Sequence, residues 1–93
     1  MNNYKLILDS HAIKDLKKID KSQAKIIINW IEKNLNNCSN PRHISSYKNL
    51  TGNLKGHVRY RIGSYRIICE IQDDKLIIIA VAVGHRKEIY KKR

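Results

Sequence analysis

The fold of this chain is decided by residues 57–72, which read HVRYRIGSYRIICEIQ. Apolar and polar side chains alternate on both sides of Gly63 and Ser64, and a period of two is typical of strands whose faces have different surroundings. A glycine-containing pair between two such runs also favours a two-residue hairpin turn. We therefore predict an antiparallel hairpin with strands over residues 57–62 and 65–72.

The predicted hairpin places its basic side chains on one face. Residues that lie opposite one another point to the same side of a sheet, so Arg61 and Arg66 share a face with Arg59. The other face suits packing against helices, and its residues are Val58, Tyr60, Ile62, Tyr65, Ile67, Cys69 and Ile71. Opposed like charges destabilise a sheet by roughly 0.2–1 kcal/mol per pair. The arginines are either ordinary solvated side chains or a binding site for a polyanion, and we favour the polyanion.

A third strand is predicted at residues 75–83, after a turn at Asp73 and Asp74. Continuing the alternation through this strand predicts that His85 lies on the arginine side, beside Arg86. It also predicts an apolar stripe on that side, made of Ile68, Ile77, Ile79, Val81 and Val83. Such a stripe needs cover from water, and we expect the C-terminal segment and a partner protein to supply it.

The first half of the chain predicts a strand and two helices. Residues 4–8, YKLIL, suit a short strand, and Asp9 or Ser10 can cap a first helix whose apolar residues recur at helical spacing. A second helix is predicted from about residue 22 to residue 36. Residues 36–56 are rich in Asn, Ser and Gly and are predicted to be a loop. The fold class is therefore α+β, with a helical hairpin packed on one face of an antiparallel meander.

Composition favours a single basic domain over residues 1–93, because 19 Lys and Arg against 8 Asp and Glu give a net charge of +11. Residues 42–93 carry 12 of the basic and 4 of the acidic residues, so we expect the anion-binding chemistry there. No apolar run reaches the roughly 18 residues that span a bilayer, and no signal peptide is recognisable. We predict a cytoplasmic protein without membrane association, with Cys38 and Cys69 as free thiols. No spacing suggests metal ligands, and neither a metal nor a cofactor is expected.

Two stretches resemble the RelE/ParE superfamily of bacterial toxins, namely LKGHVRYRIGSYRIICEI at residues 54–71 and DDKLIIIAVAVGHRKEIY at residues 73–90. Within it, the chain resembles the RelE-like mRNA interferases of type II toxin–antitoxin systems. The resemblance implies a small twisted antiparallel sheet with the helical hairpin on one face. It also implies an endoribonuclease that cleaves mRNA in the ribosomal A site. The expected partners are a small RelB-like antitoxin, the mRNA and ribosomal RNA.

The resemblance also implies roles for single residues. The implied catalytic set is Arg59, Arg61, Arg66, His85, Arg86 and Tyr90. The first two match phosphate-contacting positions, Arg66 follows the turn tyrosine, and Arg86 and Tyr90 match the C-terminal motif, which His85 matches more loosely. Further RNA contacts are expected from Lys55, Lys87, Lys91, Lys92 and Arg93.

Metal-free RNA cleavage needs a base for the ribose 2′-hydroxyl, an acid for the leaving 5′-oxygen and cations for the phosphorane. The strand arginines can supply the cations through forked donors. Tyr90 is the base implied by the resemblance, provided that nearby cations lower its pKa from about 10. His85, whose type has a pKa near 6.5, is the predicted proton donor and shares this role with Arg86. Alternatively, Tyr90 is a packing residue that anchors the tail.

Two other functions fit the same sequence. A ParE-like inhibitor of DNA gyrase would share the fold and would not cut RNA. A non-catalytic module that binds RNA or the ribosome would use the basic patch without cleavage. The basic strand residues together with Arg86 and Tyr90 favour the nuclease.

Overall fold

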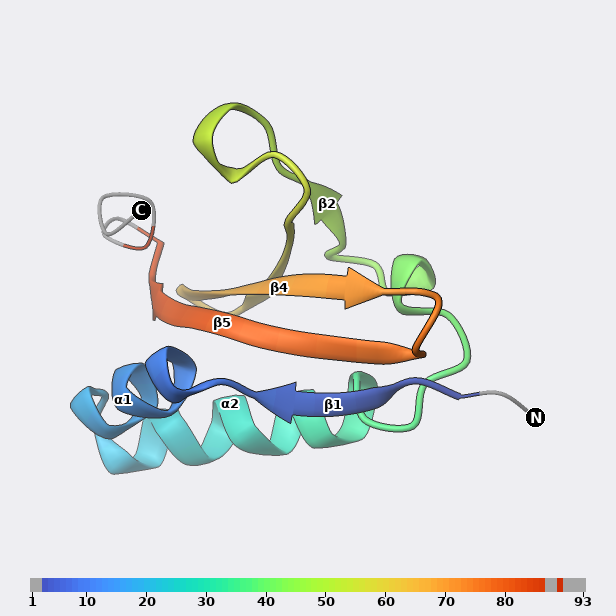
Figure 1. Cartoon of the computed structure of the whole chain (residues 1–93). Coiled ribbons are helices and arrows are strands. Elements are labelled where there is room, and N and C mark those ends of the chain that lie inside the picture. Colours follow the sequence, from blue (N-terminus) through green and yellow to red (C-terminus); the bar gives the residue numbers. More distant parts are fainter. Residues whose placement is uncertain (1–2, 87–88, 90–93) are drawn as a thin grey trace.

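A five-stranded sheet carries two helices on one of its faces (Figure 1). The computed structural model describes residues 3–86 and 89. The strand order is β1-β5-β4-β3-β2, and β1 runs parallel to β5 whereas all other neighbours are antiparallel. The elements are β1 (Lys5–Leu8), α1 (Ser10–Lys18), α2 (Lys21–Asn34), the 3-10 helix η1 (Pro41–His43), β2 (Lys48–Asn49), the 3-10 helix η2 (Gly52–Leu54), β3 (Val58–Ile62), β4 (Tyr65–Gln72) and β5 (Ile77–His85).

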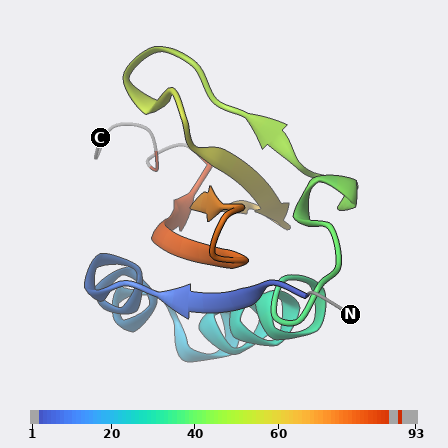
Figure 2. The same ribbon diagram turned by 45° about the vertical axis from the view of Figure 1, so that its right-hand side comes forward.

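The predicted α+β fold class is confirmed, and the sheet is mixed rather than purely antiparallel because β1 pairs in parallel with β5. The segment 36–56 is more structured than the predicted loop, since it contains η1, η2 and the short strand β2, which pairs with β3. Figure 2 shows β2 at the opposite end of the molecule from the helices. Within the described part of the chain, neither helix is long and apolar enough to cross a bilayer.

The connection between β4 and β5 is longer than predicted. Residues 73–76 form a four-residue turn in which the Leu76 N–H donates to the Asp73 carbonyl at 3.3 Å. Leu76 has a φ of 54°, an uncommon left-handed conformation for a leucine. The strand predicted from residue 75 therefore begins at Ile77 and ends at His85.

Both helices begin at an aspartate cap and bury one face against the sheet. The Asp9 carboxylate accepts from the Ala12 N–H at 2.9 Å, and the Asp20 carboxylate accepts from the Ser22 N–H at 3.2 Å. The resulting helix-side core consists of Ala12, Leu16, Ile27, Ile31, Leu35, Val58, Tyr60, Ile62, Ile67, Cys69, Ile78, Ala80 and Val83. Each fully buried aliphatic side chain of this kind contributes roughly 1.5–3 kcal/mol.

Tyr60 is the largest fully buried side chain, and its hydroxyl is satisfied by donating to the Pro41 carbonyl at 2.8 Å. Burial raises the pKa of Tyr60 well above the ordinary tyrosine value. Cys69 is also fully buried, and burial raises the pKa of its thiol. Both side chains therefore belong to the core, as the alternation of β3 and β4 predicts.

A β-bulge in β5 decides which side chains face which way. Ile68 of β4 lies opposite Ala82, whereas the next residue, Cys69, lies opposite Ala80, so Val81 is an extra residue in β5. An extra residue reverses the alternation of every residue that follows it in the strand. Val83 consequently joins the helix-side core, and the prediction that it lies on the arginine side is wrong.

Candidate functional site

The basic residues of β2, β3 and β4 gather on the side of the sheet that faces away from the helices. Arg61 lies opposite Arg66, and Arg59 lies opposite Lys48 on β2, so the register places all four on one face. The predicted hairpin register is thereby confirmed. We call Lys48, Arg59, Arg61 and Arg66 the arginine face.

The arginines differ in how they are held. The Arg59 side chain is half-buried, its Nη1 donates to the Ser46 carbonyl at 3.4 Å, and its Nε is buried without a hydrogen-bond partner among the described residues. Arg61 is exposed, and its backbone N–H donates to the Ser46 hydroxyl at 3.1 Å. Arg66 Nη1 donates to the Tyr65 carbonyl at 3.3 Å. Backbone oxygens therefore help to orient Arg59 and Arg66.

Two guanidinium groups of this face, those of Arg59 and Arg61, have no carboxylate partner in the part of the chain that the structure describes. Glu70 lies on the same side of β4, where it accepts a hydrogen bond from Gln72 Nε2 at 2.7 Å. An external anion can therefore bind the guanidinium groups of Arg59 and Arg61 without displacing a carboxylate of the described residues.

An apolar cluster forms the floor beside the arginines. Ile68, Ala82 and Ile89 are buried together, and Leu50, Leu54 and Val81 pack against them. A Cβ added to Gly84 would lie 3.0 Å from Ile89 Cδ1, so glycine allows Ile89 to lie directly over β5. The prediction that the C-terminal segment covers part of the apolar stripe is confirmed at Ile89.

His85 lies on the opposite side of the sheet from the arginine face, so its predicted position is wrong. It is paired with Tyr65, and the two rings meet edge-on with centroids 5.7 Å apart. It lines a hollow beside α1 that also includes Asp15 and Lys18. The bulge at Val81 is the physical reason, because it reverses the alternation of β5 before His85 is reached.

The remaining predicted site residues lie at the edges of the face or outside the described residues. Arg86 is exposed, and its N–H donates to the Ser64 carbonyl at 2.8 Å, which brings it to the β3–β4 turn. Lys55 is exposed immediately after η2. The predictions that lie outside the described residues concern Lys87, Tyr90, Lys91, Lys92 and Arg93.

Lys48 is the basic residue of this face that the sequence analysis missed. It belongs to a segment whose Asn and Ser content predicts a loop, and its strand is only two residues long. The order Tyr47, Lys48, Asn49, Leu50 does not alternate apolar and polar side chains, so the sequence offered no period-two signal for this strand. Lys48 and Arg59 also border a cavity of about 340 Å³, whose other lining residues are Asn49, Leu50, Thr51 and Leu54.

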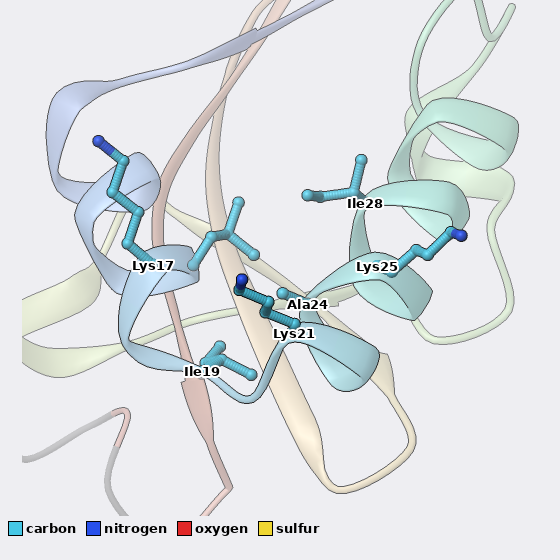
Figure 3. A pocket seen from close by; sticks show the side chains of 7 residues that line it. Lys17, Ile19, Lys21, Ala24, Lys25 and Ile28 are labelled. Carbon is cyan, nitrogen blue, oxygen red and sulfur yellow. The ribbon is translucent and has the colours of Figure 1, made fainter.

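A second surface lies between the two helices (Figure 3). This helical groove has a volume of about 360 Å³ and is lined by Leu16, Lys17, Ile19, Lys21, Ala24, Lys25 and Ile28. Figure 3 shows Ala24 and Ile28 on the α2 side of the groove, with the amino groups of Lys17 and Lys25 pointing away from it. Ile28 and the neighbouring Ile13 are each 40% exposed, which is high for such large apolar side chains.

Comparisons with known proteins point to one group of toxins. The sequence model of the ParE toxin of type II toxin–antitoxin systems (parDE) matches residues 6–90. A RelE-like toxin protein of Escherichia coli is 30% identical over 89 residues, which cover 90% of this chain and 84% of that protein.

Solved structures show the same fold. The chain resembles the RelBE2 toxin–antitoxin complex of Mycobacterium tuberculosis, with a TM-score of 0.77 and 23% identity over 90% of this chain and 99% of that one. It also resembles the isolated RelE toxin of Escherichia coli, with a TM-score of 0.66 and 22% identity over 96% and 93% of the two chains.

Proposed function

Since the chain belongs to the ParE toxin family of type II toxin–antitoxin systems, within the RelE/ParE superfamily, we propose that it is an endoribonuclease that cleaves mRNA in the ribosomal A site. The observation that carries this proposal is the arginine face. Arg61 and Arg66 lie directly opposite one another, and like charges so placed cost the sheet stability. Neither Arg59 nor Arg61 has a carboxylate partner among the described residues, and this arrangement is useful if the face binds a phosphate backbone.

The proposed chemistry needs no metal. The ribose 2′-oxygen attacks the adjacent phosphorus, the bond from phosphorus to the 5′-oxygen breaks, and the products are a 2′,3′-cyclic phosphate and a 5′-hydroxyl. Arg59, Arg61 and Arg66 bind the nonbridging oxygens, whose negative charge grows in the phosphorane. Guanidinium groups suit this role because they stay charged and present donors in a rigid fork.

Proton transfer is assigned to the C-terminal motif. We assign Tyr90 as the base that takes the 2′-hydroxyl proton, a role that requires nearby cations to lower its pKa from about 10. Arg86 hydrogen-bonds the leaving 5′-oxygen, and a water molecule supplies the proton because arginine holds its own too tightly. His85 is not part of this set, because it lies on the helix side of the sheet, opposite the arginine face.

We also propose that a small RelB-like antitoxin binds this toxin. The RelBE2 relative was solved as a toxin–antitoxin complex. For this chain we assign the helical groove as a docking surface for an acidic, amphipathic helix of the antitoxin. Ile28 in the groove and the neighbouring Ile13 supply an exposed apolar strip. Lys17, Lys21 and Lys25 supply positive charge without ion-pair partners among the described residues.

The chief rival is inhibition of DNA gyrase, which the match to the ParE toxin model favours. A gyrase inhibitor has no need for residues that stabilise a phosphorane, so the two functions predict different effects of changing the arginine face. A module that binds the ribosome without cutting RNA is the third possibility for the same basic surface.

Incubation of the purified protein with mRNA, with and without programmed ribosomes and with EDTA in the free-RNA arm, tests the proposal. We expect cleavage within the A-site codon only when ribosomes are present. Intact mRNA in both arms would contradict the proposal, and a supercoiling assay with gyrase would then identify the rival. Ribosome binding without cleavage or gyrase inhibition would indicate the non-catalytic module.

A further inference from the structure

The cavity beside β2 opens next to the arginine face and has the composition of a ligand site. Its volume of about 340 Å³ falls at the lower end of the range of roughly 300–1,000 Å³ that is usual for small-molecule pockets. Lys48 and Arg59 line it from β2 and β3, Leu50 lies just before η2, and Leu54 is the last residue of η2. We call this cavity the β2 pocket.

Arg59 connects the β2 pocket to the arginine face. Its side chain lines the pocket, and its backbone lies in the same strand as Arg61, which faces the same side of the sheet. Its Nε is buried and has no acceptor within the described part of the chain. The Arg59 guanidinium group forms no ion pair with a described carboxylate, so its charge is available to an anion at the edge of the pocket. Lys48, opposite Arg59, adds a second cation at the same edge.

The rest of the lining suits a nucleobase rather than a second phosphate. Leu50 and Leu54 pack against the buried Ile68 cluster and offer an apolar surface. The Thr51 side chain makes no capping hydrogen bond to η2, so its hydroxyl can serve a base edge or a ribose. The pocket therefore combines cations, an apolar surface and a small polar group. Arginine planes and base-edge hydrogen bonds are among the means by which proteins bind unstacked nucleotides of single-stranded RNA, and Arg59 and Thr51 can supply them.

We propose that the β2 pocket binds one nucleotide of single-stranded RNA, next to the phosphate held by Arg59 and Arg61, and contributes to sequence preference. The base lies against Leu50 and Leu54, the Thr51 hydroxyl contacts its edge, and Lys48 contacts a flanking phosphate. This subsite deepens the proposed endoribonuclease function and rests on the same face binding RNA.

Binding of short single-stranded RNAs, measured by fluorescence anisotropy, tests the subsite without requiring cleavage. The RNAs carry a 2′-deoxy sugar at each candidate cleavage position, and they differ by one of the four bases at a single place. Thr51→Val and Leu54→Ala are compared with the wild type. Asn53→Ala is the matched control, because Asn53 is exposed in η2 and does not line the pocket.

We expect Thr51→Val to reduce the ratio of dissociation constants between the best and the worst base by about 2-fold to 13-fold, the range of one hydrogen bond. Leu54→Ala should weaken the binding of all four RNAs, and Asn53→Ala should bind each RNA with the wild-type affinity. Because Thr51 is exposed, Thr51→Val should leave the fold intact. Thr51→Val therefore still tests the pocket if Leu54→Ala unfolds.

The subsite is overturned if Thr51→Val keeps the wild-type base preference and affinity, or if the wild-type protein binds none of the RNAs. A ribosome assay with intact mRNA separates the two proposals. If the predicted binding pattern appears while the wild-type protein leaves ribosome-bound mRNA intact, the subsite is supported and the nuclease function is contradicted.

Discussion

At the scale of single residues, the arginines that we propose to bind RNA repel one another and so reduce the stability of the fold. Arg61 and Arg66 are directly opposed, and neither Arg59 nor Arg61 has a carboxylate partner among the described residues. The charges are held by backbone contacts, such as the bond from Arg66 Nη1 to the Tyr65 carbonyl. Sequence alternation alone was enough to predict this grouping, because a two-residue turn fixes the register of a hairpin.

The first prediction is that Arg61→Gln stabilises the fold. Removing one of two opposed charges should raise the free energy of unfolding by about 0.2–1 kcal/mol, measured by urea denaturation at low salt. Lys14→Gln, at an exposed position of α1, is the control for loss of a charge from this basic protein. If Arg61→Gln were less stable than the wild type, the Arg61 side chain would stabilise the fold, and the claim that Arg61 and Arg66 repel one another would be contradicted.

At the scale of elements, the bulge of β5 and the glycine that follows it shape the site. The bulge turns His85 toward the helices, and Gly84 lets Ile89 pack onto the arginine side. Neither the bulge nor the packing of Ile89 could be predicted from periodicity, since residues 77–83 are a continuous apolar run with no alternation that an extra residue would interrupt. The helices and the hairpin were predictable because their caps and turn are local signals.

A second prediction concerns the anchor of the C-terminal segment. Ile89 is completely buried against Ile68 and Ala82, so Ile89→Ala should lower the free energy of unfolding by about 2–5 kcal/mol. We expect RNA cleavage to fall further than the loss of folded protein explains, because Tyr90 follows this anchor. Val58→Ala, a core truncation at an equally buried position of the helix side, is the control. Equal cleavage per folded molecule in both variants would contradict this role of Ile89.

A third prediction concerns the helical groove. Ile28→Glu should weaken antitoxin binding by about 10-fold or more, because a carboxylate would be buried in an apolar contact. Calorimetry with the cognate antitoxin measures this loss, and cleavage by the free toxin should stay at the wild-type rate. Asn29→Glu places the same charge one residue away, outside the groove. Equal antitoxin affinity for both variants would exclude the groove as the docking surface.

A fourth prediction concerns the loop that joins β4 to β5. The Asp73 carboxylate accepts from Arg42 Nη1 at 2.9 Å and from the Tyr4 hydroxyl at 2.6 Å, and these contacts, Arg42 first, lower its pKa. A pKa lowered by folding contributes stability above the unfolded value, near 3.9, and this stability disappears as the pH falls through the folded value. Between about pH 5 and pH 2, the wild type should therefore lose more stability than Asp73→Asn.

Thermal unfolding across this pH range measures the difference. Asp74→Asn, at the exposed neighbouring position, is the matched control and should follow the wild-type profile. If Asp73→Asn and the wild type lose stability in parallel as the pH falls, the hydrogen bonds from Arg42 and Tyr4 to the Asp73 carboxylate do not stabilise the fold.

At the scale of the whole molecule, the sheet divides the protein into two surfaces with different proposed partners. One side holds the arginine face and the β2 pocket, and the other holds the helices with their lysine-rimmed groove. The net charge of +11 favours anionic partners on both sides. The sequence predicted the fold class and the three strand arginines. It missed Lys48 and misplaced His85, because a two-residue strand and a bulge are tertiary features.

The most direct test of the arginine side as the active surface is single-turnover cleavage of ribosome-bound mRNA by the wild type, Arg61→Gln and His85→Ala. We predict that Arg61→Gln, although at least as stable as the wild type, cleaves about 100-fold or more slowly, as expected for loss of a group that stabilises transition-state charge. His85→Ala, on the helix side, should keep the wild-type rate. Wild-type cleavage by Arg61→Gln, or an equal loss in both variants, would contradict the account.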